Sequence, residues 1–297
     1  MANNFVIVGL GELLWDMLPN GKQLGGAPAN FAYHAQVLGN QGIIASRVGP
    51  DDLGKEILDR LGTLKLKTDY VQTDEIMPTG TVAVEVSEKG QPKYTITEDV
   101  AWDCLEWTDQ WESLAKQAKA VCFGSLAQRT TQTRVTIRRF LRAMAPGAVR
   151  IFDVNLRQMF YNTEIVHDSM LLADLVKLNE QELPQVMRLL GLKSGNLKAN
   201  VRTLLETYGL KMVCLTRGHL GCMLANEKQV IENQGFKVRV ADAVGAGDAF
   251  TAAMVHHFLK GTSLEKTAQA ANRLGSYVAS QSGATPQIDK NILNQVV

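Results

Sequence analysis

Short runs of apolar, β-branched residues alternate with segments of helical periodicity along most of the chain. The apolar runs have the length of buried strands, and the segments between them repeat apolar residues every three or four positions. This pattern predicts strands at residues 5–9, 43–48, 120–123, 149–154, 175–178 and 212–216. It predicts helices at residues 28–38, 53–61, 133–144, 181–190, 197–208, 248–259 and 264–279. The expected fold class is α/β, a Rossmann-like three-layer arrangement in which a parallel sheet is flanked by helices and joined by right-handed crossovers.

Residues 79–97 interrupt this alternation. The stretches 79–86 and 92–97 have strand character, and residues 88–91 between them have the composition of a hairpin turn. A hairpin inserted in an α/β core usually projects from it, where it can cover a site or pair with another subunit. The alternative is a surface excursion with no such role.

Composition limits the class of protein. A chain of 297 residues can bury a large core as one unit, so we expect a single domain spanning residues 1–297. Lys and Arg number 31 against 30 Asp and Glu, and the resulting net charge of +1 favours neither nucleic acid nor an anionic membrane as a partner. The four cysteines lack metal-binding spacing, and the chain shows no export signal or membrane-spanning apolar run. These features predict a cytoplasmic protein with reduced thiols.

The segment 242–250, Asp-Ala-Val-Gly-Ala-Gly-Asp-Ala-Phe, carries the strongest chemical signal. Small residues precede a helix here, so the amides of Gly245, Ala246 and Gly247 are expected at its N-terminus, where free N–H groups can hold an anion. Asp248 follows directly. Such a site suits an alcohol that attacks phosphorus, with Asp248 taking the hydroxyl proton and the amides stabilising the phosphoryl group. The alternative is an ordinary aspartate in the first turn of a helix.

Two other glycine-containing segments are not phosphate loops. The segment 49–56 has the spacing of a P-loop, but Glu56 replaces the hydroxyl that would bind Mg²⁺. Gly9 and Gly11 follow an apolar strand, but Leu14 occupies the position of the third glycine of a dinucleotide fingerprint. A nicotinamide-dependent enzyme is therefore not expected.

Asp16 is placed on a loop after the first predicted strand. A carboxylate can accept hydrogen bonds from two adjacent sugar hydroxyls. Gly25, Gly26 and Asn30 would complete this grip, because glycine exposes backbone to a ligand and an amide both donates and accepts. The alternative for Asp16 is a solvated loop charge, since most aspartates are exposed.

Arg157 lies beyond the carboxyl end of the predicted strand 149–154. A guanidinium at this position can clamp the substrate or the transferred phosphate, because it stays charged and binds oxyanions through two N–H groups. The alternative is a local salt bridge with Asp153.

Asn179 and Glu182 open a helix directly after a strand, the place where α/β proteins collect ligands. Glu182 can hold a water of a hydrated Mg²⁺ that bridges nucleotide phosphates. The alternative is simple capping, in which Asn179 and an acidic first turn stabilise the helix N-terminus.

Taken with the loop that ends at Asp248, these segments resemble the ribokinase-like (PfkB) sugar kinases, most closely the fructokinase branch, and the likeness covers essentially the whole chain. The resemblance implies a ribokinase-like fold with a small β lid, its elements near residues 12–23 and 79–107. It also favours sugar binding for Asp16 and a Mg²⁺ role for Glu182. The motifs that carry it are, in order, residues 11–16, 24–32, 101–103, 123–129, 152–157, 178–182, 216–221 and 242–248.

The resemblance further implies roles for residues whose patterns alone would not indicate them. ATP binding is implied for Thr216, Arg217, Gly218, Gly221 and Asn272. A monovalent cation, K⁺, is implied at Asp242 and the segment 278–283. Residue 243 is alanine where members of the family often carry threonine. The implied partners are Mg²⁺ with ATP, a small sugar, and a second copy of the chain through the lid.

The sequence therefore predicts an ATP-dependent sugar kinase that phosphorylates the primary hydroxyl of a ketose or furanose, with conversion of D-fructose to fructose 6-phosphate as the favoured case. One alternative is a 2-keto-3-deoxygluconate kinase, in which Arg157 or Arg129 would meet the substrate carboxylate. Another is a ribose or nucleoside kinase. A catalytically silent sugar-binding sensor is a third alternative, against which Asp248 and the intact loop before it argue.

Overall fold

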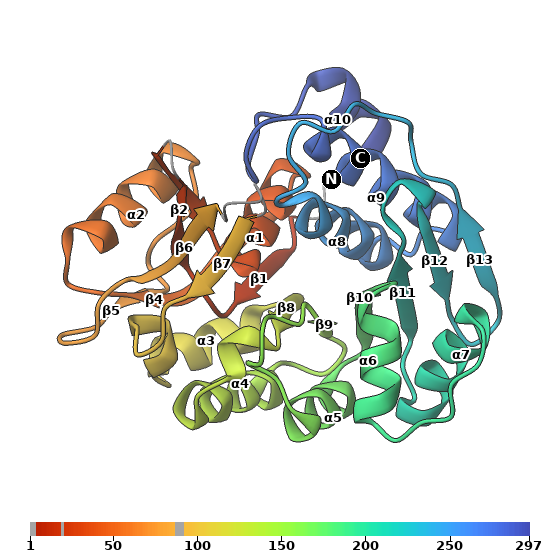
Figure 1. The fold of residues 1–297 in the computed structure, drawn as a ribbon, viewed down its shortest axis with the longest axis horizontal. Helices are drawn as coiled ribbons and strands as arrows, with labels where there is room; N and C mark the ends of the chain where they lie inside the picture. Colours follow the sequence, from red (N-terminus) through yellow and green to blue (C-terminus); the bar gives the residue numbers. More distant parts are fainter. Residues whose placement is uncertain (1–3, 19–20, 87–91) are drawn as a thin grey trace.

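The computed structural model describes residues 4–18, 21–86 and 92–297, and its core is a large β-sheet (Figure 1). The strands of this sheet are β1 (Val6–Leu10), β4 (Gln41–Val48), β5 (Val71–Thr73), β8 (Ala120–Gly124), β9 (Val149–Asp153), β10 (Leu175–Asn179), β11 (Met212–Thr216), β12 (Cys222–Ala225) and β13 (Val230–Asn233). Their order is β13-β12-β11-β10-β9-β8-β1-β4-β5. Neighbouring strands from β11 to β5 run parallel, which confirms the predicted α/β fold class.

One edge of the sheet differs from the prediction. Strands β12 and β13 pair antiparallel beyond β11. The sequence analysis predicted neither of them, nor β5, because each has only three or four residues and too few positions for a pattern to be detected.

Helices cover both faces of the sheet because its strands are apolar on both sides. In β8, for example, Val121 and Phe123 face one layer, whereas Ala120 and Cys122 face the other. The first layer contains α3 (Asp109–Gln117), α4 (Thr131–Ala143), α5 (Thr163–Leu172), α6 (Glu182–Leu189) and α7 (Leu197–Tyr208). The second contains α1 (Ala27–Val37), α8 (Ala246–Leu259), α9 (Leu264–Ala279) and α10 (Lys290–Val296). Helices α3, α5 and α10 were not predicted.

Helix α1 lies unusually close to the sheet. A Cβ atom at Gly9 in β1 would be 2.0 Å from the carbonyl oxygen of Pro28, and one at Gly42 in β4 would be 2.0 Å from that of Ala32. No other residue fits at either position without moving the backbone. The two glycines thus fix the depth at which α1 packs, and α1 in turn packs against α8.

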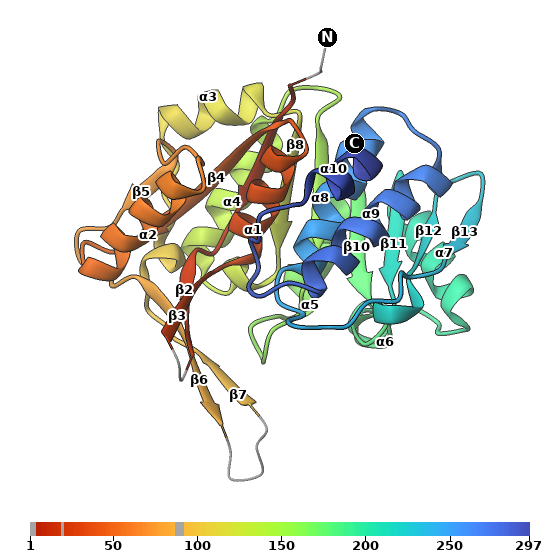
Figure 2. The same ribbon diagram turned by 90° about the horizontal axis from the view of Figure 1, so that it is seen from above.

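A second, four-stranded sheet projects from the body of the molecule (Figure 2). Its order is β3-β2-β6-β7, formed by β2 (Leu14–Leu18), β3 (Gly21–Gly25), β6 (Gly80–Val86) and β7 (Pro92–Ile96). The antiparallel pairing of β6 with β7 confirms the predicted hairpin, whose predicted turn at 88–91 lies outside the described residues. Helix α2 (Asp52–Thr63) packs beside this small sheet, with Ile57 and Leu61 in a shared apolar cluster.

The placement of Asp16 on a loop was wrong, because residues 14–18 form β2. Strand β2 pairs antiparallel with β3, the next strand in sequence, and in parallel with β6, which lies far along the chain. A local pattern therefore could not reveal it.

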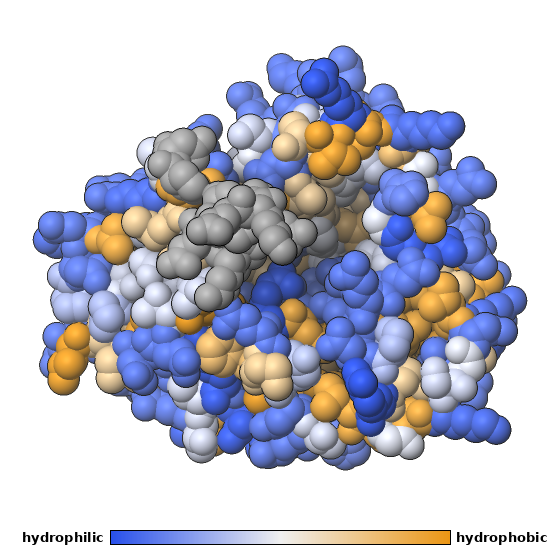
Figure 3. All heavy atoms as spheres, viewed as in Figure 1, coloured by the Kyte–Doolittle hydropathy of each residue, from blue (hydrophilic) through white to orange (hydrophobic). Residues whose placement is uncertain are grey.

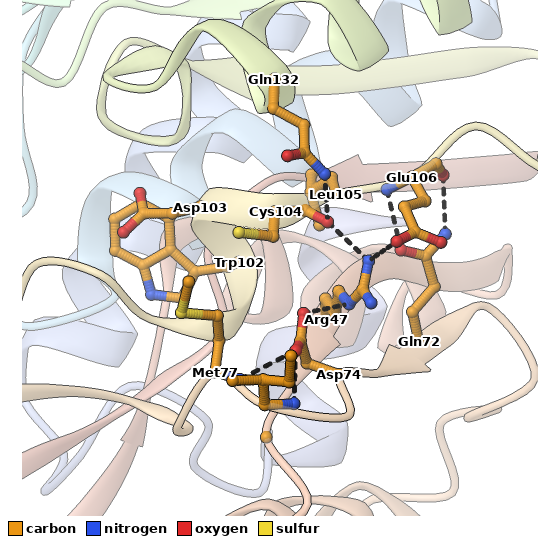
Figure 4. Close-up of polar contacts among 12 residues, drawn as sticks. Arg47, Gln72, Asp74, Met77, Trp102, Asp103, Cys104, Leu105, Glu106 and Gln132 are labelled. Carbon is orange, nitrogen blue, oxygen red and sulfur yellow. Dashed lines mark hydrogen bonds and ion pairs between the residues drawn. The ribbon is translucent and has the colours of Figure 1, made fainter.

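Two arginines hold the segments that precede and follow the β6–β7 hairpin in sequence. At the end of β4, the Arg47 side chain contacts Asp74 at 2.9 Å and Glu106 at 2.8 Å, and donates to the carbonyl oxygen of Cys104 at 2.6 Å (Figure 4). Arg129 donates to both carboxylate oxygens of Asp103 at 2.7 and 2.6 Å. Such two-bond guanidinium pairs fix direction as well as distance, and Arg129 also donates to the carbonyl oxygen of Thr97, next to the end of β7, at 2.6 Å.

Within the described residues, no helix combines the length and the apolar character needed to cross a lipid bilayer.

The segment 49–56, which has P-loop spacing, serves a structural purpose. Asp51 accepts from the amide of Gly54, as the N-cap of α2, and from the hydroxyl of Thr79 at 2.6 Å.

Candidate active site

The predicted phosphate loop leads into α8, which begins at Ala246, two residues earlier than the sequence pattern indicated. Gly245 is the N-cap, with φ of 77° in the left-handed region. The amide of Ala246 donates to the carbonyl of Ala243 at 3.4 Å, and the amide of Ala249 donates to that of Gly245 at 2.9 Å. The amides of Gly247 and Asp248 precede this helical bond, so they belong to the first turn, where N–H groups have no carbonyl partner inside the helix.

Asp248 is held by a residue from the other end of the chain. The side-chain amide of Asn30 in α1 donates to Asp248 Oδ2 at 2.8 Å. Burial raises the pKa of Asp248 to about 6, and nearby Asp153 raises it further, whereas Asn30, Lys177 and Arg157 oppose the rise. A carboxyl group with this pKa is ionised at neutral pH and remains basic enough to accept a proton during a reaction.

Lys177 lies beneath the loop and was missed in the sequence analysis. Its Nζ atom contacts the two carboxylate oxygens of Asp153 at 3.1 and 3.2 Å. A Cβ atom on Gly247 would be 3.3 Å from the same Nζ, so the ammonium lies next to the loop backbone. Burial alone would lower the pKa of Lys177, but Asp153, Glu182 and Asp248 outweigh burial and raise it. A charged residue inside the apolar strand β10 was the signal that could have revealed it.

Thr251 completes this arrangement from one turn further along α8. Its hydroxyl contacts Asp153 Oδ2 at 3.3 Å and the carbonyl oxygen of Gly247 at 2.9 Å. Asp153 is thus engaged by Lys177 and Thr251, and the rival reading of a salt bridge between Asp153 and Arg157 was wrong.

The residues predicted to bind sugar come together around the start of α1. Asp16 lies opposite Gln23 on β3, and a Cβ atom at Gly25 would be 2.5 Å from Asp16 Oδ2. Gly26 is the N-cap of α1, one turn before Asn30. Burial raises the pKa of Asp16 to about 6; Arg157 opposes this rise and Asp242 adds to it.

Arg157 is exposed, and among the described residues it forms no ion pair. Its guanidinium favours the ionised forms of Asp16 and Asp248, so it lies within electrostatic range of both. Arg129, named as an alternative partner for a substrate carboxylate, is instead buried against Asp103 and 4.0 Å from the Trp102 ring. Arg157 is the better placed of the two for an anion.

Asn179 and Glu182 show the capping arrangement that was the alternative to a metal role. Asn179 Oδ1 accepts from the amides of Gln181 and Glu182, both at 2.9 Å. Glu182 is buried, and its two carboxylate oxygens accept from the amides of Leu156 at 3.0 Å and Asn179 at 2.8 Å. Burial raises the pKa of Glu182, and Lys177 opposes that rise. The Mg²⁺ role stays a prediction.

The residues predicted to bind ATP lie at the ends of neighbouring strands. Thr216 is the register partner of Asn179 across β10 and β11. Arg217 forms an ion pair with Glu232 at 3.0 Å. Gly218 and Gly221 bracket a single 3-10 turn, and both have positive φ.

Asn272 and Asp242 have defined partners of their own. Asn272 is buried, and its amide donates to the side-chain oxygen of Asn233 at 2.8 Å. Asp242 accepts from the amides of Val244 at 3.0 Å and Gly283 at 3.2 Å. The loop before α8 and the segment 278–283 therefore meet, as the predicted cation site requires.

The surface is hollowed between the small sheet and α8, with hydrophilic residues along the border of the hollow (Figure 3). The carboxyl ends of the parallel strands and the N-terminus of α8 meet at this edge of the large sheet, the usual ligand site of open α/β folds.

The chain belongs to the pfkB family of carbohydrate kinases, whose model matches residues 19–291. The uncharacterized sugar kinase PH1459 of Pyrococcus horikoshii is 29% identical over 306 residues, which cover 96% of this chain and 94% of that protein. A fructokinase of Escherichia coli is 30% identical over 264 residues, covering 83% and 82%.

Solved structures agree with this assignment. The PH1459 crystal structure superposes with a TM-score of 0.82 at 26% identity, covering 98% of this chain and 99% of that one. The fold is ribokinase-like, of the fructokinase type, and the protein is an ATP-dependent sugar kinase.

Replacing Asn30 with Ala should raise the pKa of Asp248. A hydrogen bond to a charged group contributes about 1.5 kcal/mol, close to one pKa unit, so the value should move from about 6 to roughly 7. NMR titration of ¹³C-labelled aspartate side chains measures it. The control is Asn196→Ala, which removes a distant cap of α7 and should leave Asp248 unchanged. An unaltered pKa in Asn30→Ala would show that the hydrogen bond does not tune Asp248.

Proposed function

We propose that the enzyme transfers the γ-phosphoryl group of ATP to the primary hydroxyl of a ketose, with D-fructose converted to fructose 6-phosphate. The position of Asp248, an ionised carboxyl group at the N-terminus of α8, supports the reaction. The choice of fructose rests on the similarity to fructokinases, of which the Escherichia coli protein is 30% identical.

Asp248 acts as the general base in this proposal. It accepts the proton of the sugar hydroxyl as the sugar oxygen forms a bond to the γ-phosphorus and the bond from phosphorus to the β–γ bridging oxygen breaks, releasing ADP. The amides of Gly245, Ala246 and Gly247 stabilise charge on the transferred group, because fixed donors aimed at a developing charge need no reorganisation during the reaction.

The sugar binds beside this loop. Asp16 accepts hydrogen bonds from its hydroxyls, and the backbone at Gly25 and Gly26 and the side chain of Asn30 complete the contact. Arg157 contacts the phosphoryl group, since its guanidinium is exposed and has no carboxylate partner among the described residues. Asn30 links sugar and base, because its amide also holds Asp248.

The nucleotide lies along the ends of β10 and β11. Thr216, Arg217 and Gly218 contact its phosphates and ribose, Asn179 lies beside them, and Gly221 and Asn272 shape the adenine side. A crystal structure of the Pyrococcus horikoshii sugar kinase, 25% identical and superposing with a TM-score of 0.77, is a complex with ATP.

Glu182 would hold a water of the Mg²⁺ that accompanies the nucleotide, and the ion would neutralise phosphate charge. The donor set fits an outer-sphere role: both oxygens of Glu182 already accept backbone amides, so the carboxylate has lone pairs for a metal-bound water rather than for the ion itself. A ribokinase II structure from Escherichia coli, 20% identical, is a complex with ATP and Mg²⁺.

The small sheet serves as a lid in a single-domain enzyme spanning residues 1–297, its elements lying near residues 12–23 and 79–107. Closure would exclude water from the transferred phosphoryl group. Strands β3 and β7 are its edges and offer unpaired backbone groups to a second copy of the chain. A sedimentation measurement that finds only monomer at all concentrations would contradict that pairing.

A coupled assay of ADP release tests the substrate. The panel contains D-fructose, 2-keto-3-deoxygluconate, ribose, adenosine and fructose 6-phosphate. We expect kcat/KM for fructose to exceed the others by at least about tenfold, since groups placed for one pattern of hydroxyls are left unpaired by another. A higher value for 2-keto-3-deoxygluconate would favour a carboxylate contact with Arg157. Higher values for ribose or adenosine would favour the corresponding kinases, and the absence of turnover would favour a silent sensor.

The monovalent cation site is proposed at Asp242 and the backbone of residues 278–283. Asp242 joins the two segments through the amides of Val244 and Gly283, so an ion there would stiffen the loop before α8. A Vibrio cholerae fructokinase variant, 21% identical, was solved with fructose, ADP and a potassium ion. K⁺ should raise kcat above its value in Na⁺ or tetramethylammonium. Equal kcat values in the three salts would contradict the proposed cation site.

A further inference from the structure

Glu12 is a buried carboxyl group near Asp248 that has no role in the mechanism above. It lies on the turn between β1 and β2 and is 3% exposed. The backbone amides of Glu12 and Ala27 act to lower the pKa of this carboxyl group, and Ala27 is the first residue of α1, a helix with no acidic residue in its own first turn. Its Oε2 atom has no hydrogen-bond partner in the described part of the chain.

Glu12 and Asp248 line the same narrow, partly open cavity. Its volume is about 10 Å³, which is room for about one water molecule and too small for a sugar. Asp153 and Asn155 also line it, so a water there would have several polar partners. A single water can therefore bridge the two carboxyl groups.

The charges around the cavity favour a state in which Glu12 and Asp248 hold one proton between them. Burial raises the pKa of Glu12 to about 7, its own backbone amide opposes this, and the negative charge of Asp248 raises it again. Arg157 opposes the rise at both carboxyl groups, and Lys177 opposes it at Asp248. Asp248 therefore ionises first, near pH 6, and its charge delays ionisation of Glu12.

We propose that Glu12 is a positioning residue for phosphoryl transfer: it faces Asp248 across a cavity for one water and keeps the single proton of the pair, leaving Asp248 ionised as the base. The protonated Glu12 donates to the bridging water, which donates to Asp248. The inference rests on the proposed role of Asp248 and holds for whichever sugar the enzyme uses.

This proposal predicts a basic limb in the pH profile, in which kcat falls as the pH rises. Above about pH 7 Glu12 ionises, and a second buried negative charge then opposes both Asp248 and the incoming phosphoryl group. We expect kcat to fall roughly fivefold between about pH 7 and pH 9. The other groups near the cavity titrate too high to cause this limb, because the pKa of Cys122 is raised by burial and that of Lys177 is raised by its carboxylate neighbours.

Glu12→Gln tests the inference, because glutamine has the shape of the protonated residue, still donates a hydrogen bond and cannot ionise. With MgATP and the sugar of highest kcat/KM in the panel, the variant should keep kcat within about threefold at about pH 6.5 and lose the basic limb. Its acid limb, set by Asp248, should remain. Glu112→Gln, an exposed control in α3, should keep the wild-type profile. A loss of more than about a hundredfold at about pH 6.5, or a basic limb that persists, would overturn the inference.

NMR titration of ¹³C-labelled glutamate in the wild-type enzyme provides a readout that needs neither sugar nor a folded variant. Glu12 should titrate near pH 7. A Glu12 that is already ionised at pH 6 would overturn the proposal. If Glu12 titrates near pH 7 but no sugar is phosphorylated, the proposed function is wrong, whereas the inference that Glu12 and Asp248 share one proton is supported.

Discussion

The close packing of α1 on the sheet and against α8 is the constraint on which the site depends. Gly9 and Gly42 leave no Cβ atom between the strands and the helix, so α1 packs at a depth that a larger residue would prevent. At that depth Asn30 donates to Asp248, and the first amide of α1 is near enough to Glu12 to lower the pKa of its carboxyl group. Residues more than two hundred positions apart in sequence are thereby fixed within hydrogen-bonding distance, without a flexible loop between them.

The site also brings together several buried carboxyl groups. Asp16, Glu12 and Asp248 are all carboxyl groups whose pKa is raised, chiefly by burial. Lys177 is buried near Asp248 but is already paired with Asp153, and Arg157 is exposed. A site of this kind holds its carboxyl groups near their titration points, which suits a base that must accept and then release a proton.

Sequence reasoning worked where the information was local. The parallel strands and most helices follow from continuous apolar runs and helical spacing, and the loop at residues 242–248 carries its own chemistry. It failed where partners are distant. Strand β2 is sandwiched between β3 and the distant β6, and the buried Arg129 is paired with Asp103; neither the β6 pairing nor the ion pair can be read from neighbouring residues. Glu12 lay inside a recognised motif, but only the cavity it shares with Asp248 distinguishes it.

The replacement Asp248→Asn tests the central claim most directly, because it keeps shape and hydrogen bonding and removes the base. With circular dichroism confirming the fold, kcat should fall roughly a hundredfold to ten-thousandfold. The calorimetric Kd for the sugar should change by less than about threefold, since Asp16 and the backbone at Gly25 and Gly26 are proposed to supply most of the sugar contacts. The control Asp109→Asn, at an exposed position of α3, should leave both kcat and the Kd for the sugar unchanged. Turnover near that of the wild type would show that Asp248 is not the base and would contradict the account.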